Sequence, residues 1–138
     1  MRVLVTHYPL RGFDAIHVAS ALDLRDETGV VLNHISDGER TFLFRAFWFA
    51  RSFDTPLPSF EQDVSSAAAR ADDISWKSHV SEFRDIRGGT LAFFRNLPAE
   101  ACDRRGTASG NPFTVRALAY IVAGHLAHHR AILDERYL

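Results

Sequence analysis

Residues 113 to 138, FTVRALAYIVAGHLAHHRAILDERYL, constrain the fold most, because they carry one long amphipathic pattern. Thr114 is a candidate N-cap, and neither Pro nor Gly follows Gly124 to end a helix. One face of this predicted helix collects Leu118, Ile121, Val122, His125, His129 and Ile132. Two imidazoles one turn apart on a buried face destabilise the fold unless their nitrogens are satisfied. A metal ion would satisfy them, provided that another helix supplies a third ligand.

Three further helical patterns precede this segment. The first covers residues 13 to 29 and is expected to end at Gly29, and the second runs from about Val30 to Phe53. The third begins after the candidate N-cap Ser75 and continues to about Asn96. Long Pro- or Gly-containing connections separate them, with a candidate short helix at residues 63 to 72. We therefore predict an all-α fold, a single four-helix bundle of up-down-type helices with long connections.

Composition excludes several classes of function. The formal net charge is −1, from 16 basic and 17 acidic residues, so the chain lacks the basic footprint of a nucleic-acid-binding protein. No apolar run approaches the ~20 residues of a membrane span, and the N-terminal segment lacks the apolar region of a signal peptide. A single cysteine, Cys102, allows no internal disulfide and fits a reducing compartment, so we expect a cytoplasmic protein. Its thiolate would also bind a metal ion, but the sequence does not place it near the histidines.

His34 is the candidate third ligand. It lies on the inner face of the second predicted helix, one turn before Gly38, which leaves space for a neighbouring side chain. With His125 and His129 it would complete a three-nitrogen site whose remaining coordination positions are open, as in catalytic metal sites. The alternative is that these are core or partly exposed histidines bonded to the backbone and water, and spacing alone leaves both readings open. His128 is expected at the rim, and the surface is expected to hold His7, His17 and His79.

Other polar residues could support the ion or bind substrate, namely Asp37, Glu39, Arg45 and Arg87. Asp37 lies one turn from His34 and could orient its free ring nitrogen. Glu39 and Arg40 are candidates for the same region, with surface salt bridges as the alternative. The two inward arginines, Arg45 and Arg87, fall on otherwise apolar faces. Each must pair with Glu39 or Glu82, face an open pocket and bind an anionic substrate, or extend to the surface.

The segment FLFRAFWFARSF is the most apolar part of the chain. Phe42 and Phe49 belong to the core face, whereas Phe44, Phe47 and Trp48 point elsewhere on the helix. A helix that is apolar nearly all round is either central or at an interface. We therefore expect a homodimer that uses this helix.

Residues from about 30 to 138 resemble the DinB/YfiT-like family of metal-binding four-helix bundles. The resemblance rests on HISDGERTFLFRAFWFAR followed by TPLPSFEQD, then EFRDIRGGTLAFFRNLP and the last segment beginning at GTASGNPF. In that family a histidine early in the second helix and an HxxxH pair in the last helix bind a divalent ion. The resemblance therefore implies that His34, His125 and His129 bind Ni²⁺, Zn²⁺ or Fe²⁺, and dimers are frequent among the related proteins.

Related proteins include low-molecular-weight thiol transferases and hydrolases. The resemblance thus implies a metal-dependent enzyme of thiol S-transferase or hydrolase type that acts on a small-molecule substrate, such as a low-molecular-weight thiol. The alternative is a non-catalytic bundle that binds metal or a partner in a DNA-damage or stress response.

Residues 11 to 29, RGFDAIHVASALDLRDETG, depart from this family and resemble a C-terminal helix of PIN-domain nucleases. In such nucleases the counterpart of Asp14 is one of several acids that hold metal ions. Two-metal chemistry needs several clustered carboxylates, and one Asp cannot supply it. We therefore expect no nuclease activity, and expect residues 1 to 29 to serve as the first helix of the bundle.

Overall fold

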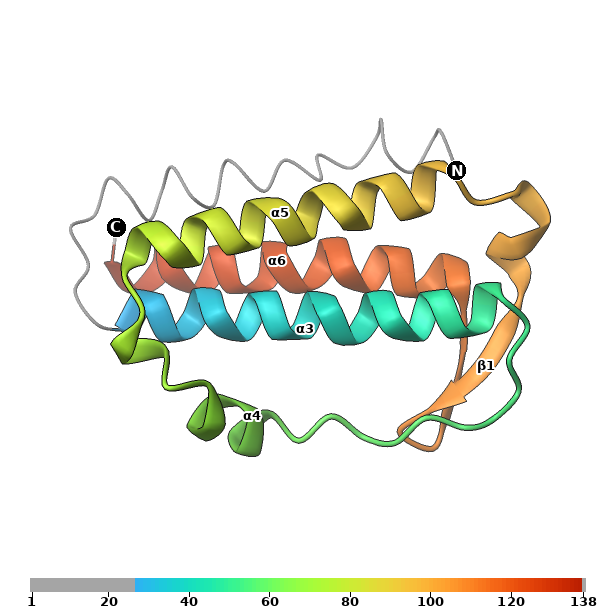
Figure 1. Ribbon diagram of the computed structural model, residues 1–138, viewed down its shortest axis with the longest axis horizontal. Coiled ribbons are helices and arrows are strands. Elements are labelled where there is room, and N and C mark those ends of the chain that lie inside the picture. Colours follow the sequence, from blue (N-terminus) through green and yellow to red (C-terminus); the bar gives the residue numbers. More distant parts are fainter. Residues whose placement is uncertain (1–26, 138) are drawn as a thin grey trace.

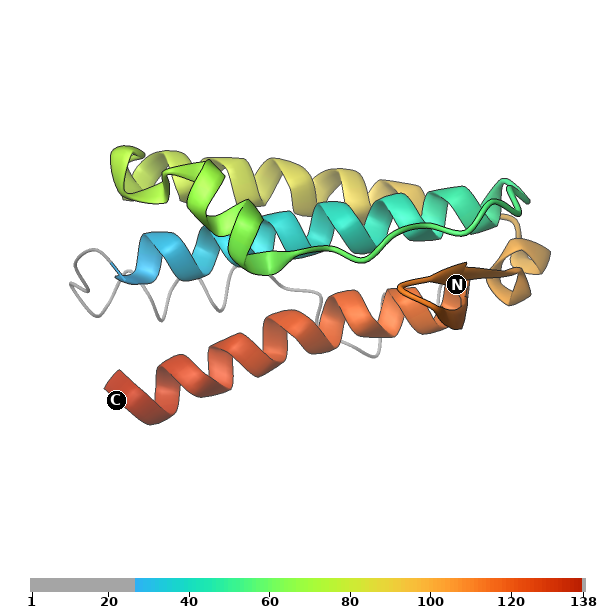
Figure 2. The same ribbon diagram turned by 90° about the horizontal axis from the view of Figure 1, so that it is seen from below.

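The protein is described by a computed structural model that places residues 27–137. Three long helices lie side by side along the molecule, α3, α5 and α6 (Figures 1 and 2). The bounds of the elements are α3 Glu27–Ala50, α4 Gln62–Ala69, η1 Ala71–Asp73, α5 Trp76–Arg95, η2 Ala99–Asp103, β1 Arg105–Ala108, β2 Asn111–Thr114 and α6 Val115–Tyr137. Within these residues, none of the helices has the length and apolar character needed to cross a membrane.

The helices begin and end close to the predicted positions, with one correction. Thr114 Oγ1 accepts a hydrogen bond from the Ala117 amide at 3.0 Å, and Ser75 Oγ accepts one from the Ser78 amide at 3.2 Å, so both predicted N-caps are confirmed. The expected end of a helix at Gly29 is wrong, because Gly29 lies inside α3. The rest of the predicted first helix, with Asp14 and His17, lies outside the described residues, and so does His7.

A short β-hairpin occupies part of the segment expected to be a polar connection. Strands β1 and β2 pair in antiparallel register from Arg105 opposite Thr114 to Ala108 opposite Asn111. The turn residues Ser109 and Gly110 both have positive φ, at 52° and 74°. This is the conformation that two-residue hairpin turns require, and a Ser-Gly pair is a recognisable turn signal. The strands are too short to produce a readable alternating pattern, so sequence analysis missed them.

Two apolar clusters hold the long helices together. The larger lies toward the hairpin and contains Ala46, Phe49, Phe94, Leu97, Val115 and Leu118, among others. The smaller lies toward the start of α3 and contains Leu32, Ile35, Phe83 and Leu126. Each cluster joins α3, α5 and α6. Burial of these side chains therefore fixes the three helices relative to one another.

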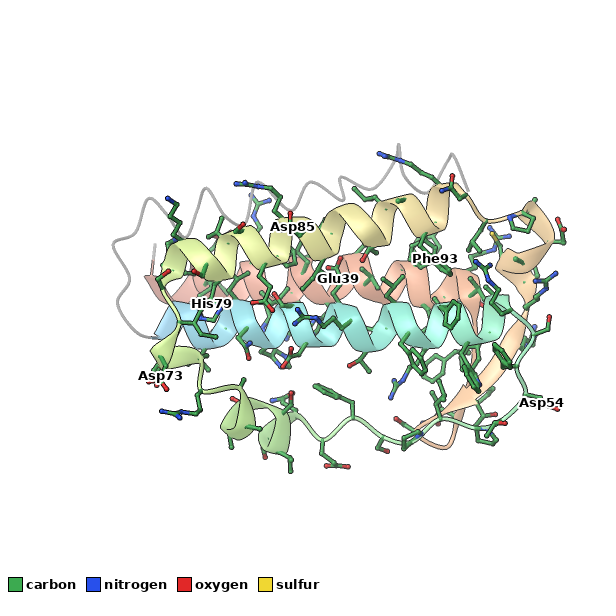
Figure 3. All side chains as sticks on the ribbon, viewed as in Figure 1. Glu39, Asp54, Asp73, His79, Asp85 and Phe93 are labelled. Carbon is green, nitrogen blue, oxygen red and sulfur yellow. The ribbon has the colours of Figure 1, made fainter. Side chains whose placement is uncertain are left out.

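Some predicted surface residues are buried. His79 is 1% exposed and its Nε2 lies 3.0 Å from the Ala71 carbonyl oxygen, so its assignment to the surface was wrong. It sits on α5 between the helices, opposite Gly29 of α3 (Figure 3). Cys102, expected in a polar loop, is buried in η2. His79 lies at helical spacing with the buried Phe83 and Arg87 of α5, so the period of that helix could have indicated its burial, whereas Cys102 lies in a stretch without a period.

The aromatic face of α3 is exposed in part. Phe44 is 50% exposed and Phe47 is 36% exposed, whereas Trp48 stacks on Phe53 with ring centroids 4.1 Å apart. The Trp48 indole donates a hydrogen bond to the Thr55 carbonyl oxygen at 3.0 Å. Exposed phenylalanine side chains of this kind are typical of protein–protein interfaces. The homodimer stays a prediction.

A buried ion pair crosses the α3–α5 interface between the two apolar clusters. Arg87 Nε and Nη2 donate to Glu39 Oε2 at 3.0 Å and 2.6 Å, and the side chains are 5% and 2% exposed (Figure 3 labels Glu39). Of the alternatives left open for Arg87, the structure shows the pair with Glu39, and extension of Arg87 to the surface is wrong, as is the surface alternative for Glu39. Glu39 Oε1 and Arg87 Nη1 have no partner among the described residues.

We expect removal of one partner to cost far more stability than removal of both. Glu39→Leu leaves the Arg87 charge buried and unpaired, so the free energy of unfolding, measured by urea denaturation, should fall by about 3–5 kcal/mol. The double variant Glu39→Leu/Arg87→Met should recover most of that loss, because no buried charge remains. A double variant that unfolds as readily as Glu39→Leu would contradict this account.

Candidate metal centre

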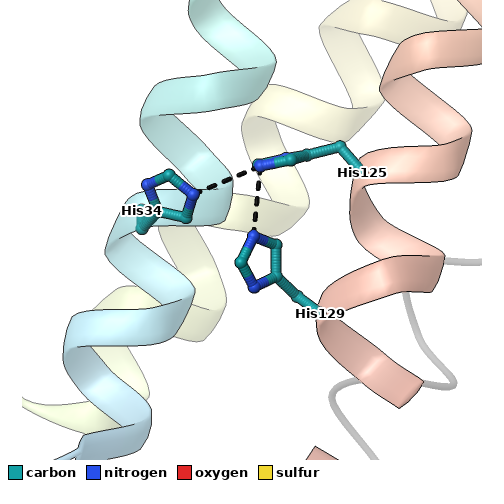
Figure 4. Close-up of side chains that lie close together, drawn as sticks. All are labelled: His34, His125 and His129. Carbon is teal, nitrogen blue, oxygen red and sulfur yellow. Dashed lines mark hydrogen bonds between the residues drawn. The ribbon is translucent and has the colours of Figure 1, made fainter. Parts of the chain in front are cut away.

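Three imidazoles converge between α3 and α6. His34 extends from α3, and His125 and His129 extend from successive turns of α6 (Figure 4). The Nε2 atom of His125 lies 3.2 Å from Nε2 of His34 and 3.2 Å from Nε2 of His129. The ligand atoms of the three side chains all lie within 4.8 Å of one another. The residues that two separate helical faces singled out are therefore brought together.

Gly38 makes room for this arrangement. A Cβ atom at Gly38 would lie 2.7 Å from His125 Cε1, closer than real side chains allow. The ring of Phe42, one turn further along α3, meets the His125 ring edge to face, with centroids 5.6 Å apart. His125 is thus held between a glycine and an aromatic ring, which limits the positions its ring can adopt.

The nitrogen positions fit a divalent ion. Zn–N bonds are about 2.0–2.1 Å, so two imidazole nitrogens on one tetrahedral ion are separated by about 3.3 Å. The two Nε2–Nε2 distances of 3.2 Å agree with that separation. Without an ion, the His125 Nε2 can carry at most one proton, so it cannot donate to both neighbours. Three imidazoles also leave at least one coordination position open for another ligand.

The electrostatics of the cluster keep its nitrogens available as ligands. Burial, followed by charge repulsion from the neighbouring His129, His34 and His128, lowers the pKa of His125 to about 4. Burial also lowers the pKa of His129, followed by repulsion from His34 and His128. Both side chains are therefore neutral at pH 7, which is the form that binds a metal ion.

The other predicted site residues lie in different surroundings. Asp37 accepts hydrogen bonds from Arg40 Nη1 at 3.2 Å and from Ser65 Oγ at 2.8 Å. No hydrogen bond joins Asp37 to His34 among the described residues, and a role of Asp37 in orienting His34 stays a prediction. Arg40 also pairs with Glu82 at 2.6 Å, which confirms its surface salt bridge. The hydrogen bond of Ser65 joins α4 to α3. The residues around Ser65 are small or polar, and no pattern among them predicts this contact.

Four more candidate residues have partners or positions outside the cluster. Glu39 and Arg87 pair with each other in the core. Cys102 is not among the described residues that could share an ion with the histidines. Arg45 donates from Nη2 to the Pro58 carbonyl oxygen and to Ser109 Oγ, at 3.2 Å and 3.0 Å. His128, expected at the rim, is exposed.

Acid should destabilise the metal-free protein through His125. An unfolded imidazole takes up a proton near pH 6.5, whereas folded His125 stays neutral down to about pH 4. Within this window the unfolded state binds more protons, so the free energy of unfolding falls as the pH falls from 6.5 toward 4. Above 6.5 the contribution of His125 is fully present.

Urea unfolding of chelator-treated protein at about pH 7, 5.5 and 4.5 measures this dependence. His125→Ala should show a shallower dependence than wild type, whereas exposed His128→Ala, which removes only the smallest of the repulsions on His125, should change the slope much less. Equal slopes for wild type and His125→Ala would contradict the assigned pKa.

Comparison with known proteins agrees with this architecture. The chain is similar to a solved structure of YfiT from Bacillus subtilis, with a TM-score of 0.74 and 18% sequence identity, over 96% of this chain and 81% of that chain. YfiT is described there as a probable metal-dependent hydrolase with an unusual four-helix bundle topology. At that identity the likeness shows the fold, which confirms the predicted four-helix bundle. A search of curated proteins finds no match.

A family model described as the DinB superfamily matches residues 28–133, which is most of the chain. The matched range contains α3 through most of α6, and with them all three converging histidines. The resemblance stated from the sequence is thereby confirmed. The chain belongs to the DinB superfamily.

Proposed function

We propose that the protein binds one divalent ion through Nε2 of His34, His125 and His129 and is a metal-dependent enzyme. The observation that carries this proposal is the 3.2 Å spacing of His125 Nε2 from both other Nε2 atoms. The neutral state of His125 and His129 at pH 7 supports it, because a protonated imidazole cannot bind an ion.

The residues of the chain have distinct parts in such a site. The histidines hold the ion at the α3–α6 interface, and Gly38 and Phe42 fix the His125 ring. When bound, a divalent ion acts as a Lewis acid and lowers the pKa of a coordinated water or thiol. Three imidazoles accept several first-row metals, so Ni²⁺, Zn²⁺ and Fe²⁺ are all candidates.

The reaction we propose is thiol transfer or hydrolysis on a small-molecule substrate. Both use a nucleophile whose pKa an ion can lower, as the open site would allow. The description of YfiT as a probable metal-dependent hydrolase supports the second. The likeness to thiol transferases noted from the sequence supports the first.

One observation favours a non-catalytic alternative, in which the bundle binds metal or a partner in a stress response. The two carboxylates nearest His34 along α3, Asp37 and Glu39, both have other partners. Neither is therefore free to act as a general base beside the histidines. An enzyme built on this site would have to use the ion or the substrate itself in proton transfer.

We expect wild-type protein prepared with excess divalent metal and then desalted to retain about one ion per chain by elemental analysis. His125→Ala should retain little, because only two ligands remain, and His128→Ala, which alters an exposed neighbour, should match wild type. Wild type without a stoichiometric ion would overturn the proposed site.

The same samples distinguish a metal-dependent enzyme from a non-catalytic bundle. Thiol-transfer and ester-hydrolysis rates of wild type should fall after chelation and return when the ion is restored. If the protein binds the ion stoichiometrically but neither rate depends on it, the enzyme proposal fails and the non-catalytic bundle is favoured.

Substitution of Gly38 tests the close contact between the helices. We expect Gly38→Ala to weaken metal binding by roughly tenfold or more, because its Cβ displaces His125 from its position. The matched control is Gly124→Ala on α6, where an added Cβ meets nothing within 4 Å. Metal titration monitored by calorimetry measures both, and equal affinities for the two variants would contradict the assigned role of Gly38.

A further inference from the structure

Arg45 is a mostly buried cation whose protein partners are all neutral. Its side chain is 7% exposed, and Nη2 donates to the Pro58 carbonyl oxygen and to Ser109 Oγ. Burial lowers its pKa, with no acidic group acting in the opposite direction. Among the described residues no carboxylate forms an ion pair with it, in contrast to buried Arg87 with its Glu39. A buried charge of this kind is costly unless an anion compensates it.

Two donors of the Arg45 guanidinium have no hydrogen-bond partner among the described residues. Four side-chain atoms of the described residues are fully enclosed and lack a partner, and they belong to Glu39, His79, Arg87 and Asp134. Arg45 contributes none, although its only hydrogen bonds in the described structure come from Nη2. Among the described residues, its Nε and Nη1 donors therefore have no partner and are not fully enclosed. An anion that bound them would supply the acceptors they lack.

The surroundings of Arg45 are fixed by the chain. Ser109 has φ 52°, a left-handed conformation that costs a non-glycine residue energy, and its hydroxyl accepts from Arg45 at 3.0 Å. The Ser109 amide donates to the Leu57 carbonyl oxygen at 3.1 Å, and the Leu57 amide donates to Thr107 at 2.9 Å. The hairpin and the segment after α3 thus hold the guanidinium in place, which reduces the entropy lost when it binds an anion.

Arg45 lies on the same face of α3 as His34. It follows His34 by eleven residues, which corresponds to about 16 Å along the helix and a rotation of only about 20°. Gly38 and Thr41 lie between them on that face. The Arg45 guanidinium and the histidine cluster are therefore on one side of α3, with the His125 ring packed over Gly38 between them.

We propose that Arg45 binds a carboxylate or phosphate group of the substrate. Under the proposed function the substrate is then an anionic small molecule. Assignment of the anion to a substrate rests on the proposed function, whereas binding of the anion by Arg45 does not. Both anion types suit a guanidinium, which pairs with either through charge-assisted hydrogen bonds.

The test measures anion binding by metal-free protein. Inorganic phosphate and acetate are titrated separately at constant ionic strength, and the Arg45 Nε–H and Ser109 amide NMR signals are followed. At least one anion should shift both signals saturably. Arg45→Gln should weaken that binding by roughly tenfold to a hundredfold, as judged from the Ser109 signal. Arg51→Gln, at an exposed arginine just beyond the end of α3, should leave it unchanged.

Two further variants show whether a loss of binding comes from misfolding of the protein or from an anion bound at another place. Arg45→Lys keeps the charge and should bind the anion more weakly than wild type but more tightly than Arg45→Gln. His125→Ala should retain wild-type anion binding, because the anion site does not include the histidines. Saturation by phosphate alone or by acetate alone identifies the anionic group of the substrate class.

Several results would overturn the proposal. Absence of saturable binding by either anion would do so, as would equal binding by wild type and Arg45→Gln. Loss of binding in His125→Ala would place the anion at the histidines instead. If Arg45 binds an anion but the histidines hold no ion, the proposed function fails while the anion site stands, so the two failures are distinguishable.

Discussion

The close approach of α6 to α3 at Gly38 is the contact on which the candidate site depends. Because position 38 lacks a side chain, the His125 ring can lie directly against α3, and a Cβ there would lie 2.7 Å from it. That approach places His125 Nε2 within 3.2 Å of His34 on the facing helix. His129 then follows from helical spacing alone, one turn further along α6. The absence of a side chain at Gly38 thus allows the three histidines to form a cluster.

The opposite side of α3 supports this contact. The Glu39–Arg87 pair and the apolar clusters join α3 to α5 over most of its length. A buried pair of charges adds little stability compared with apolar packing, but it strongly disfavours any register in which either charge is unpaired. Glu39 directly follows Gly38, so the pair that fixes α3 against α5 also fixes the residue that faces His125. The packing of α3 against α5 therefore helps to fix the position of α3 against the histidines of α6.

Much of the site could be predicted from the sequence because helical periodicity is regular. The spacing of His125 and His129 and the inward phase of His34 follow from 3.6 residues per turn, and Thr114 and Ser75 signal the starts of α6 and α5. That the three side chains meet depends on how α3 packs against α6, which no single helical pattern contains. The family resemblance supplied that information.

What the sequence did not reveal depends on contacts between distant segments. The partners of Asp37 include Ser65, 28 residues further along the chain in a segment of small residues. Glu39 could be read as a surface residue because a charged side chain on a helix usually reaches solvent. Its burial depends on Arg87, 48 residues further along the chain.

The charges of the residues around the histidine cluster determine which ligands such a site would attract. Three neutral imidazoles contribute no negative charge, so a bound divalent ion would keep its full positive charge and act as a strong Lewis acid. The carboxylates on α3 do not offset it, because Asp37 is engaged by Arg40 and Glu39 by Arg87. Arg45 adds a further positive charge on the same face without an acidic partner among the described residues. An arrangement with this charge attracts anionic nucleophiles and anionic substrates, whereas a site of the same shape built with carboxylate ligands would repel them.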